Sequence, residues 1–341
     1  MVTVALAGAT SGFGLTMLKT FVHLNKLSNE KHKLVLLSRS PQPELSDQAI
    51  EVRVTDYNDR IQLVNNLKDV HTILSLIGGG SPEALYSAQV AMIEAGKEAG
   101  VARFAPSEYA GHGYEGVDLY EPKARVLDFV QRSGLEYTRF ECGLFMSVLA
   151  TGTPKDVTEI GIREGRRTGE EEALAGLRPW NFVINIRAGT ADLAGDGSAE
   201  MVLMDTRDVA KFVWEALSAE KWEPVMGMRG DVTSFRELVE KLERVTWRKF
   251  LVRENAIDVL EQEARENQSR AFYNQARTAI AKGWALVGDD LNKAYPQVKP
   301  ASVDEFIEKW WAGVELGQPS WAVDQAFDVE DFAKKGGIYA R

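Results

Sequence analysis

The stretch VALAGATSGFGLTML, residues 4–18, restricts the fold of this chain more than any other part of its sequence. Apolar residues of strand character lead through Gly8, Gly12 and Gly14 into apolar positions at helical spacing. Glycines at such a turn let backbone N–H groups approach a pyrophosphate at the N-terminus of the helix. A turn with a purely structural role is the alternative. The residues expected to contact a dinucleotide here are Gly8, Thr10, Ser11, Gly12, Phe13 and Gly14.

The pattern that follows predicts an α/β fold. Strand-like runs alternate with helix-like segments, and the runs KLVLLS and HTILSLI are apolar almost throughout, as in strands covered on both faces. Strict alternation of strand and helix favours a Rossmann-type, doubly wound parallel sheet. The expected strands are 3–8, 33–38, 51–56, 71–77, 101–106 and 136–141, and the expected helices include one after the glycines, 59–69 and 82–99.

The alternation stops near residue 150, which predicts a second region. We expect residues 1–150 to form a dinucleotide-binding domain, with 195–220 packing back onto it, and residues 151–341 to form a smaller, mostly helical, substrate-binding region with a lid. The charged run GIREGRRTGEEE, residues 161–172, is interpreted as an exposed loop or lid. All eight tryptophans lie in this half, and we expect most of them to fill a core. Strands are expected at 181–186 and 201–205, and helices at 206–213, 234–245, 254–281 and 302–313.

Composition excludes several classes of function. The 40 basic and 50 acidic residues give a formal net charge of −10, which disfavours binding to nucleic acid or to an anionic membrane. No apolar run approaches the roughly 20 residues that cross a bilayer, and no secretion signal is visible. One cysteine, Cys142, fits a reducing compartment, and the four histidines lack metal-ligand spacing. We therefore expect a cytoplasmic protein without a metal, acting on a small molecule, with a homodimer left open.

The end of the second expected strand indicates which dinucleotide is bound. It reads Leu37-Ser38-Arg39-Ser40, with no acid to accept hydrogen bonds from the ribose hydroxyls of NAD. A guanidinium forms a planar fork that suits the 2′-phosphate of NADP, so Arg39 predicts NADP(H). Asp56, which closes the third strand, is placed either to touch the adenine side or to cap a helix.

Lys123 decides whether chemistry accompanies binding. Short-chain reductases commonly set Tyr and Lys four positions apart on one helix, but Leu119 stands at that position here. Pro122 is expected to begin the helix, to hold Glu121 extended and to leave Tyr120 off the helix. Burial and the helix N-terminus would both lower the pKa of Lys123, as general acid–base work requires. Taken from the residues alone, a solvent-facing lysine is the other reading.

The sequence resembles the NmrA-like and isoflavone-reductase-like group of atypical short-chain dehydrogenase/reductases. The resemblance is carried by GATSGFG, by LLSR at 36–39, by RFAPSEYAG at 103–111, by EPKARV at 121–126, by GLEYTRFECGLF at 134–145 and by AGDGSAEMVLMDTRDVAKFV at 194–213. It implies that Lys123 takes part in proton transfer, since non-catalytic members that sense the redox state of NADP tend to lack this lysine. It further implies cofactor contacts by the glycine loop, Arg39, Ser75, Leu76, Ile77, Gly78, Ser107 and Lys123.

Two departures limit what the resemblance carries. The glycine spacing is G-x-x-x-G-x-G, not the G-x-x-G-x-x-G usual in these reductases, and Gly143 stands where plant members often carry asparagine. We expect Tyr109, His112 and Phe145 to face the substrate, with a plain loop histidine as the alternative for His112. The expected function is NADPH-dependent reduction of a carbonyl or conjugated double bond in a small apolar, aromatic or secondary-metabolite substrate. A non-catalytic NADP(H)-sensing regulator and an enzyme of net non-redox chemistry are the alternatives.

Overall fold

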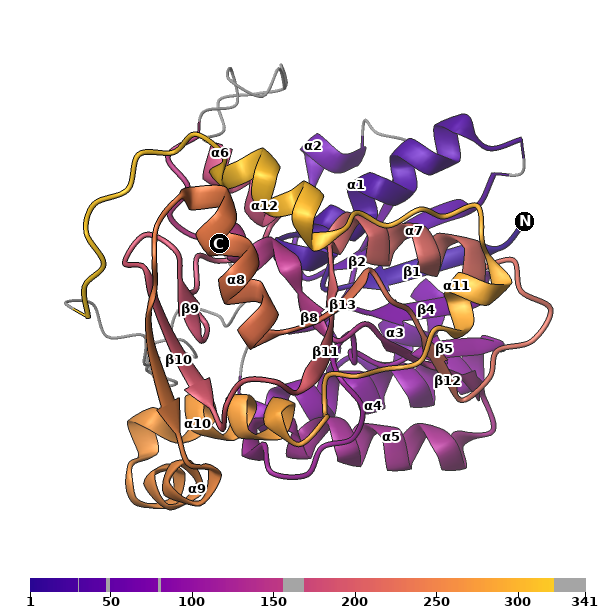
Figure 1. Ribbon diagram of the computed structural model, residues 1–341. Helices are drawn as coiled ribbons and strands as arrows, with labels where there is room; N and C mark the ends of the chain where they lie inside the picture. The colour runs from indigo at the N-terminus through magenta and orange to yellow at the C-terminus, as the bar shows by residue number, and fades with distance from the viewer. Residues whose placement is uncertain (30, 47–49, 79–80, 156–168, 322–341) are drawn as a thin grey trace.

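A six-stranded parallel sheet forms the centre of the N-terminal half, with strand order β3-β2-β1-β4-β5-β6 (Figure 1). The computed structural model describes residues 1–29, 31–46, 50–78, 81–155 and 169–321. The strand order reverses between β1 and β4, and ligands of such sheets bind at the carboxyl ends of the strands beside this point. The Rossmann-type fold class is confirmed. The strands are β1 Thr3–Ala7, β2 Lys33–Ser38, β3 Ile50–Val54, β4 Thr72–Ser75, β5 Arg103–Ala105 and β6 Glu136–Tyr137.

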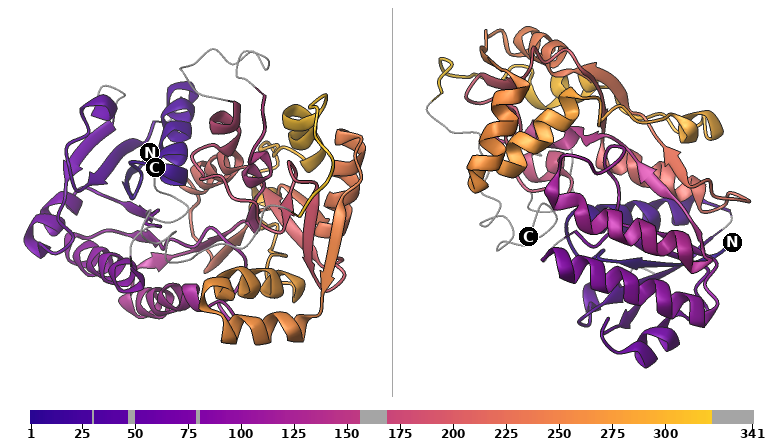
Figure 2. Two further views of the ribbon diagram at one scale, coloured as in Figure 1. Left: turned by 90° about the vertical axis from the view of Figure 1, so that its left-hand side faces the viewer. Right: turned by 90° about the horizontal axis from the view of Figure 1, so that it is seen from below.

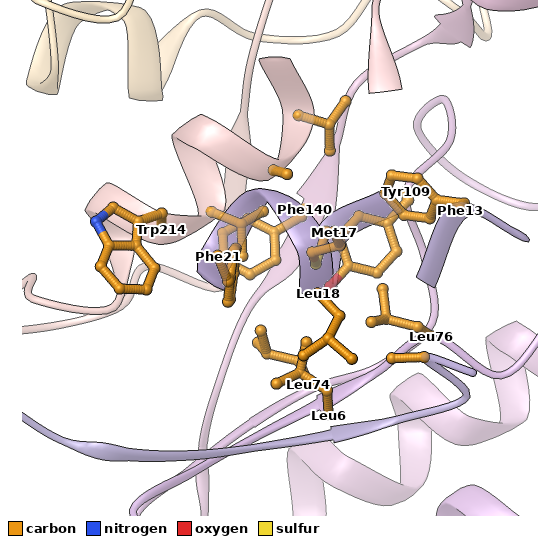
Figure 3. Packing of buried hydrophobic residues seen from close by; sticks show 14 of the residues in the cluster. Leu6, Phe13, Met17, Leu18, Phe21, Leu74, Leu76, Tyr109, Phe140 and Trp214 are labelled. Carbon is orange, nitrogen blue, oxygen red and sulfur yellow. The ribbon is translucent and has the colours of Figure 1, made fainter. Parts of the chain in front are cut away.

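Helices cover both faces of this sheet because successive side chains of each strand point to opposite sides. Leu6 of β1 belongs to the cluster packed under α1 (Gly12–Leu27) and α7 (Thr206–Ala216). Ala5 and Ala7 belong to the cluster on the other face, under α3 Arg60–Leu67, α4 Pro82–Ala99 and α5 Glu121–Ser133. Figure 3 shows Leu6 and Leu74 beneath Met17 and Leu18 of α1, with the ring of Phe21 near Trp214 of α7. Those two rings lie 5.3 Å apart.

The C-terminal half lies beside the sheet domain (Figure 2) and contributes strands to two further three-stranded sheets besides its helices. One sheet pairs β14 with β10 and β10 with β9, and the other pairs β13 with β11 and β11 with β8. Helix α7 nevertheless packs against α1 of the first half. The boundary between the two expected domains stays a prediction. The strands are β8 Leu144–Phe145, β9 Ile184–Asn185, β10 Thr190–Ala194, β11 Glu200–Met204, β13 Asp231–Ser234 and β14 Leu251–Asn255.

The helices of this half enclose their own core. Trp310 and Trp311 are buried there, whereas Trp247 at the end of α8 is 93% exposed and fills no core. Ser234 caps α8 through a capping box, in which the Ser234 hydroxyl accepts from the N–H of Glu237 and the Glu237 carboxylate accepts from the N–H of Ser234. The helices of this half besides α7 are α6 Gly169–Leu174, α8 Phe235–Thr246, α9 Ile257–Glu266, α10 Gln268–Ala281, α11 Asp290–Ala294 and α12 Val303–Trp311. The first half also contains the short helix α2 Pro43–Ser46 and the 3₁₀ turns η1 Asp118–Tyr120 and η2 Met146–Ala150.

Three expected segments differ from the structure. The strand expected at 136–141 is two strands, because after β6 the chain leaves the main sheet and β7 (Arg139–Glu141) pairs with β12 (Val225–Gly227). The helix expected at 254–281 begins as strand β14 and is then broken at Asn267, whose side chain caps α10.

The charged run at 161–172 is the third difference. Residues 161–168 lie outside the described residues, but 169–172 belong to α6 and are not an exposed loop. Glu172 pairs with Arg207 at 2.5 Å, and Glu170 accepts a hydrogen bond of 2.7 Å from the N–H of Gly152. These contacts tie the segment to α7 and to the chain after η2. Within the described residues, no helix is both long enough and apolar enough to span a bilayer.

Candidate functional site

The glycine loop is tightly packed at the carboxyl end of β1. Gly8 has φ of +82°, and a Cβ there would lie 2.7 Å from the carbonyl carbon of Leu76. A Cβ on Gly14 would lie 2.3 Å from the carbonyl oxygen of Gly8, so α1 approaches the loop closely only because position 14 has no side chain. The loop therefore presents the first N–H groups of α1, which have no intrahelical acceptor, at the edge of the sheet. Phe13 is 2% exposed, so only its backbone is available to a ligand there.

A cavity of about 260 Å³ adjoins this loop. Its wall combines the glycine loop with the ends of β2 and β4, and it includes Arg39 at an exposed position. No acid is among its lining residues in the described part of the chain, so a phosphate beside Arg39 would meet no like charge. The lining residues are Gly8, Thr10, Leu37, Ser38, Arg39, Ser40, Gln42, Tyr57, Ile77, Ala84 and Ala88.

Tyr57 is a residue of this cavity that the sequence analysis missed. Burial raises the pKa of its hydroxyl to about 12, against the opposing field of Arg39. Its neighbour Asp56 is exposed and accepts hydrogen bonds from Asn58, while the cap of α3 is Asp59. Of the two roles left open for Asp56, helix capping is therefore wrong. The available sequence signal was the end of the third strand, which pointed to Asp56. The residue that lines the cavity is Tyr57, one position after Asp56.

The segment after β4 runs close beneath the glycine loop. The N–H of Leu76 donates to the carbonyl oxygen of Ala7 at 2.7 Å, and Ile77 lines the cavity. Ser75 is fully buried, and its hydroxyl has no hydrogen-bond partner among the described residues. Gly78 is half-buried at the end of this segment. The four residues expected to lie beneath a cofactor thus stand at the correct edge of the sheet.

Lys123 lies at the carboxyl end of β5. Its Nζ donates to the backbone oxygen of Glu108 at 2.7 Å and lies 4.9 Å from the ring centre of Tyr120. Burial lowers the pKa of Lys123, against the nearby charge of Glu108. The half-buried amine is held by the protein, so the solvent-facing reading is wrong.

The start of helix α5 differs from what the proline at position 122 predicts. The helix begins at Glu121, whose φ of −52° and ψ of −46° are helical and not extended. Tyr120 ends the 3₁₀ turn η1 that runs directly into α5, which brings its ring over Lys123. A proline disfavours a helical residue before it without forbidding one, and the hydrogen bonds of the preceding turn outweigh that preference here.

Aromatic side chains from the start of α1, from the loop after β5 and from β8 pack together. The ring of Phe13 lies 5.2 Å from Tyr109 and 4.9 Å from Phe145. Tyr109 is only 3% exposed, and its hydroxyl has no partner within the described part of the chain, whereas Phe145 is half-buried. Ser107 donates its N–H to the side-chain oxygen of Gln89. Of the three residues expected to face a substrate, Phe145 shares a cluster with Tyr109 and His112 does not.

His112 lines a second cavity, of about 800 Å³, on the other side of the loop 109–120. Its Nε2 lies 3.2 Å from the carbonyl oxygen of Gly283. Tyr114 and Arg139 also line this cavity, as do residues of α5 and α10. Together with the buried Glu108 and Glu141 they form a charged cluster that sequence analysis missed, because the burial of these residues depends on contacts distant in sequence.

Cys142 is fully buried, and burial raises its pKa far above the ordinary value, which agrees with an unreactive thiol. Within the described residues, no group of three or more His, Cys, Asp or Glu side chains is arranged to hold a metal ion.

Comparison with known proteins places the chain in a family. The model described as the NmrA-like family matches residues 2–307. The chain belongs to the NmrA-like family. A relative named oxidoreductase BOA1, from Botryotinia fuckeliana, is 29% identical over 73% of this chain and 78% of its own length. Isoflavone reductase homolog A622 from Nicotiana glauca is 22% identical over 75% of this chain and 79% of its own length.

Solved structures share the fold of this NmrA-like chain. The complex of leucoanthocyanidin reductase with NADPH from Vitis vinifera has a TM-score of 0.68 at 18% identity, covering 90% of this chain and 99% of that one. A crystal structure of isoflavone reductase also has a TM-score of 0.68, at 19% identity, covering 90% and 98%. The resemblance drawn from the sequence motifs is confirmed.

Gly143 stands at a position of this NmrA-like chain where a side chain would not fit. It is buried with φ of +68°, and a Cβ there would lie 2.4 Å from the carbonyl oxygen of Val202. An asparagine at this position therefore needs a different path of β11 beside it. The wall next to Phe145 is accordingly shaped by backbone at position 143 and not by a side chain.

Proposed function

We propose that this chain is an NADP(H)-dependent reductase of a small, apolar, aromatic or secondary-metabolite substrate. The observation that carries the proposal is Lys123, a half-buried amine held 2.7 Å from the backbone oxygen of Glu108 at the carboxyl end of β5. Relatives named as oxidoreductases and an isoflavone reductase homolog support the same class of reaction.

The residues present fit an NADP(H) molecule. A Cβ at Gly8 or Gly14 would clash with the backbone that packs against the glycine loop, and the adjoining cavity carries Arg39 without an acid. The N–H groups at the start of α1 would hold the pyrophosphate, and Arg39 the 2′-phosphate, with Ser75 and Ile77 beneath. When bound, the nicotinamide supplies a hydride for a carbonyl or a conjugated double bond.

The protein's own residues would orient the substrate and handle the proton. Lys123 is placed to give a proton from Nζ to the reduced group, directly or through a water or a substrate hydroxyl, and its lowered pKa favours that transfer. Phe145 offers an apolar surface beside the ring of Phe13 and would help to exclude water. The lid expected at residues 161–172 is described only from residue 169 on, and its role remains part of the proposal.

Two other functions use the same cavity. A regulator that senses NADP(H) would bind the dinucleotide without turnover, and an enzyme of net non-redox chemistry would return it unchanged. The held amine of Lys123 favours catalysis, because a cation buried without a chemical role costs stability.

The test is oxidation of NADPH across a panel of aromatic ketones and enones by wild type, Lys123→Ala and Lys97→Ala. Lys97 is an exposed lysine in the last turn of α4 and serves as the control. We expect turnover to fall by about a hundredfold or more in Lys123→Ala, the scale of general acid catalysis, and to be unchanged in Lys97→Ala. Tight NADPH binding without turnover of any compound would establish the regulator. An altered product without net NADPH consumption would establish the non-redox enzyme.

A further inference from the structure

Glu108 is a buried acid to which the proposed reaction assigns no role. It lies in the loop directly after β5 and is 5% exposed. Its backbone oxygen accepts the hydrogen bond from Lys123, while its Oε1 atom has no hydrogen-bond partner among the described residues. An ionised carboxylate in such a position is costly unless opposite charges compensate it.

The compensating groups come from several elements. Lys123 approaches from α5, and Arg139 from β7 contributes a second positive charge near Glu108. The hydroxyl of Tyr114, in the loop before η1, also favours the carboxylate form of Glu108, and it accepts a hydrogen bond of 3.4 Å from Nη1 of Arg139. Arg139 is paired in turn with the buried Glu141.

The cluster is balanced as two acids and two cations. Burial raises the pKa of both Glu108 and Glu141 and lowers that of Lys123, so each group depends on its neighbours for its charge. Tyr120 and Cys142 also face Lys123, and burial keeps both of them protonated. Glu108 is thus the acidic group on which the charge of the Lys123 amine chiefly depends.

The cavity of about 800 Å³ reaches this cluster from the side of Tyr114 and Arg139. The backbone oxygen of Glu108 holds the Lys123 amine, while Tyr114 and Arg139 of the same cluster line the cavity.

We propose that Glu108 is the positioning residue of Lys123, whose backbone oxygen orients the amine and whose buried carboxylate, in the same cluster as Tyr114 and Arg139, keeps that amine charged until it gives up a proton. The consequence for turnover rests on the proposed function. The link between Glu108 and Lys123 itself does not, because it is a property of the protein without a cofactor.

The test measures the protonation of Lys123 directly. Wild type, Glu108→Gln and Glu115→Gln are pulse-labelled with acetic anhydride between pH 6 and 11, without nucleotide, and acetylation of Lys123 is quantified by peptide mass spectrometry. Glu115 is an exposed acid that lines the same cavity, so its variant is the matched control. Loss of the Glu108 charge should lower the pKa of Lys123 by about one unit or more, which is a tenfold rise in labelling near neutral pH.

A labelling curve of Glu108→Gln within twofold of wild type, with Lys97 labelled equally in both as a check on folding, would overturn the proposal. If Glu108→Gln does not fold, the Lys123 labelling curve of Tyr114→Phe tests the proposal instead. Removing the hydroxyl donor weakens the carboxylate form of Glu108 and should raise Lys123 labelling by about two- to threefold. An unchanged curve in Tyr114→Phe would refute the link. None of these readouts depends on turnover, so failure of the reductase proposal would leave them intact.

Discussion

Replacement of Arg39 by glutamine tests how the chain distinguishes NADPH from NADH. The guanidinium belongs to a cavity whose described lining contains no acid, so it faces no competing partner there. A hydrogen bond to a charged group contributes about 1.5–3 kcal/mol, and the exposed position of Arg39 puts its contribution near the lower end. Because 1.4 kcal/mol is a factor of ten, we expect Arg39→Gln to bind NADPH about tenfold more weakly.

Isothermal titration calorimetry with NADPH and NADH measures both affinities. NADH lacks the 2′-phosphate, so its affinity should change by less than about twofold. The NADPH deficit should shrink in high salt, which screens an exposed pair. Arg60→Gln is the control, since Arg60 is an exposed arginine paired with Glu98 at 2.9 Å, outside this cavity. Equal losses for both nucleotides, or no loss for NADPH, would refute the assignment of Arg39 to the 2′-phosphate.

Two further predictions concern the framework of the site. In Gly14→Ala the new Cβ would lie 2.3 Å from the oxygen of Gly8. We therefore expect denaturant unfolding to show that the free energy of unfolding falls by about 1–3 kcal/mol, and we expect NADPH binding to weaken. The control Gly317→Ala, at an open position, should change neither quantity. Asp192→Asn removes the charge that pairs with the buried Arg277 at 2.7 Å, so the free energy of unfolding should fall by about 3–5 kcal/mol. A fall of less than about 1 kcal/mol would contradict a structural role for this pair.

The sheet domain was predictable because its signals are local. Continuous apolar runs identified β2 and β4, and the glycine loop identified the junction of β1 with α1. The break of the expected strand 136–141 was not predictable in this way, since β7 leaves the sheet to pair with β12, more than eighty residues further along the chain. Strand β14 was missed because four of its five residues are exposed, so it lacks an alternating apolar pattern.

The site was predictable to the same extent. Glycines after a first strand and an arginine at a strand end can be recognised from their positions in the sequence. Gly8, Arg39 and Ile77 do line one cavity, and their contact with a cofactor stays a prediction. The sequence contains no comparable signal for Tyr57 or Glu108, because the burial of each depends on residues from other loops. The catalytic role of Lys123 stays a prediction, although its held amine could not have been inferred from spacing alone.

Helix α7 limits how freely the two halves of this chain can be exchanged. This helix covers one face of the six-stranded sheet, but it begins only after residue 205, between strands of the C-terminal half. Trp214 of α7 completes the contact with Phe21 of α1. A fragment ending near residue 150 would leave the apolar side of α1 bare and prone to aggregate. During synthesis the nucleotide-binding half cannot complete its packing until about two thirds of the protein has left the ribosome. A chimera with a foreign substrate-binding half must carry its own copy of this helix.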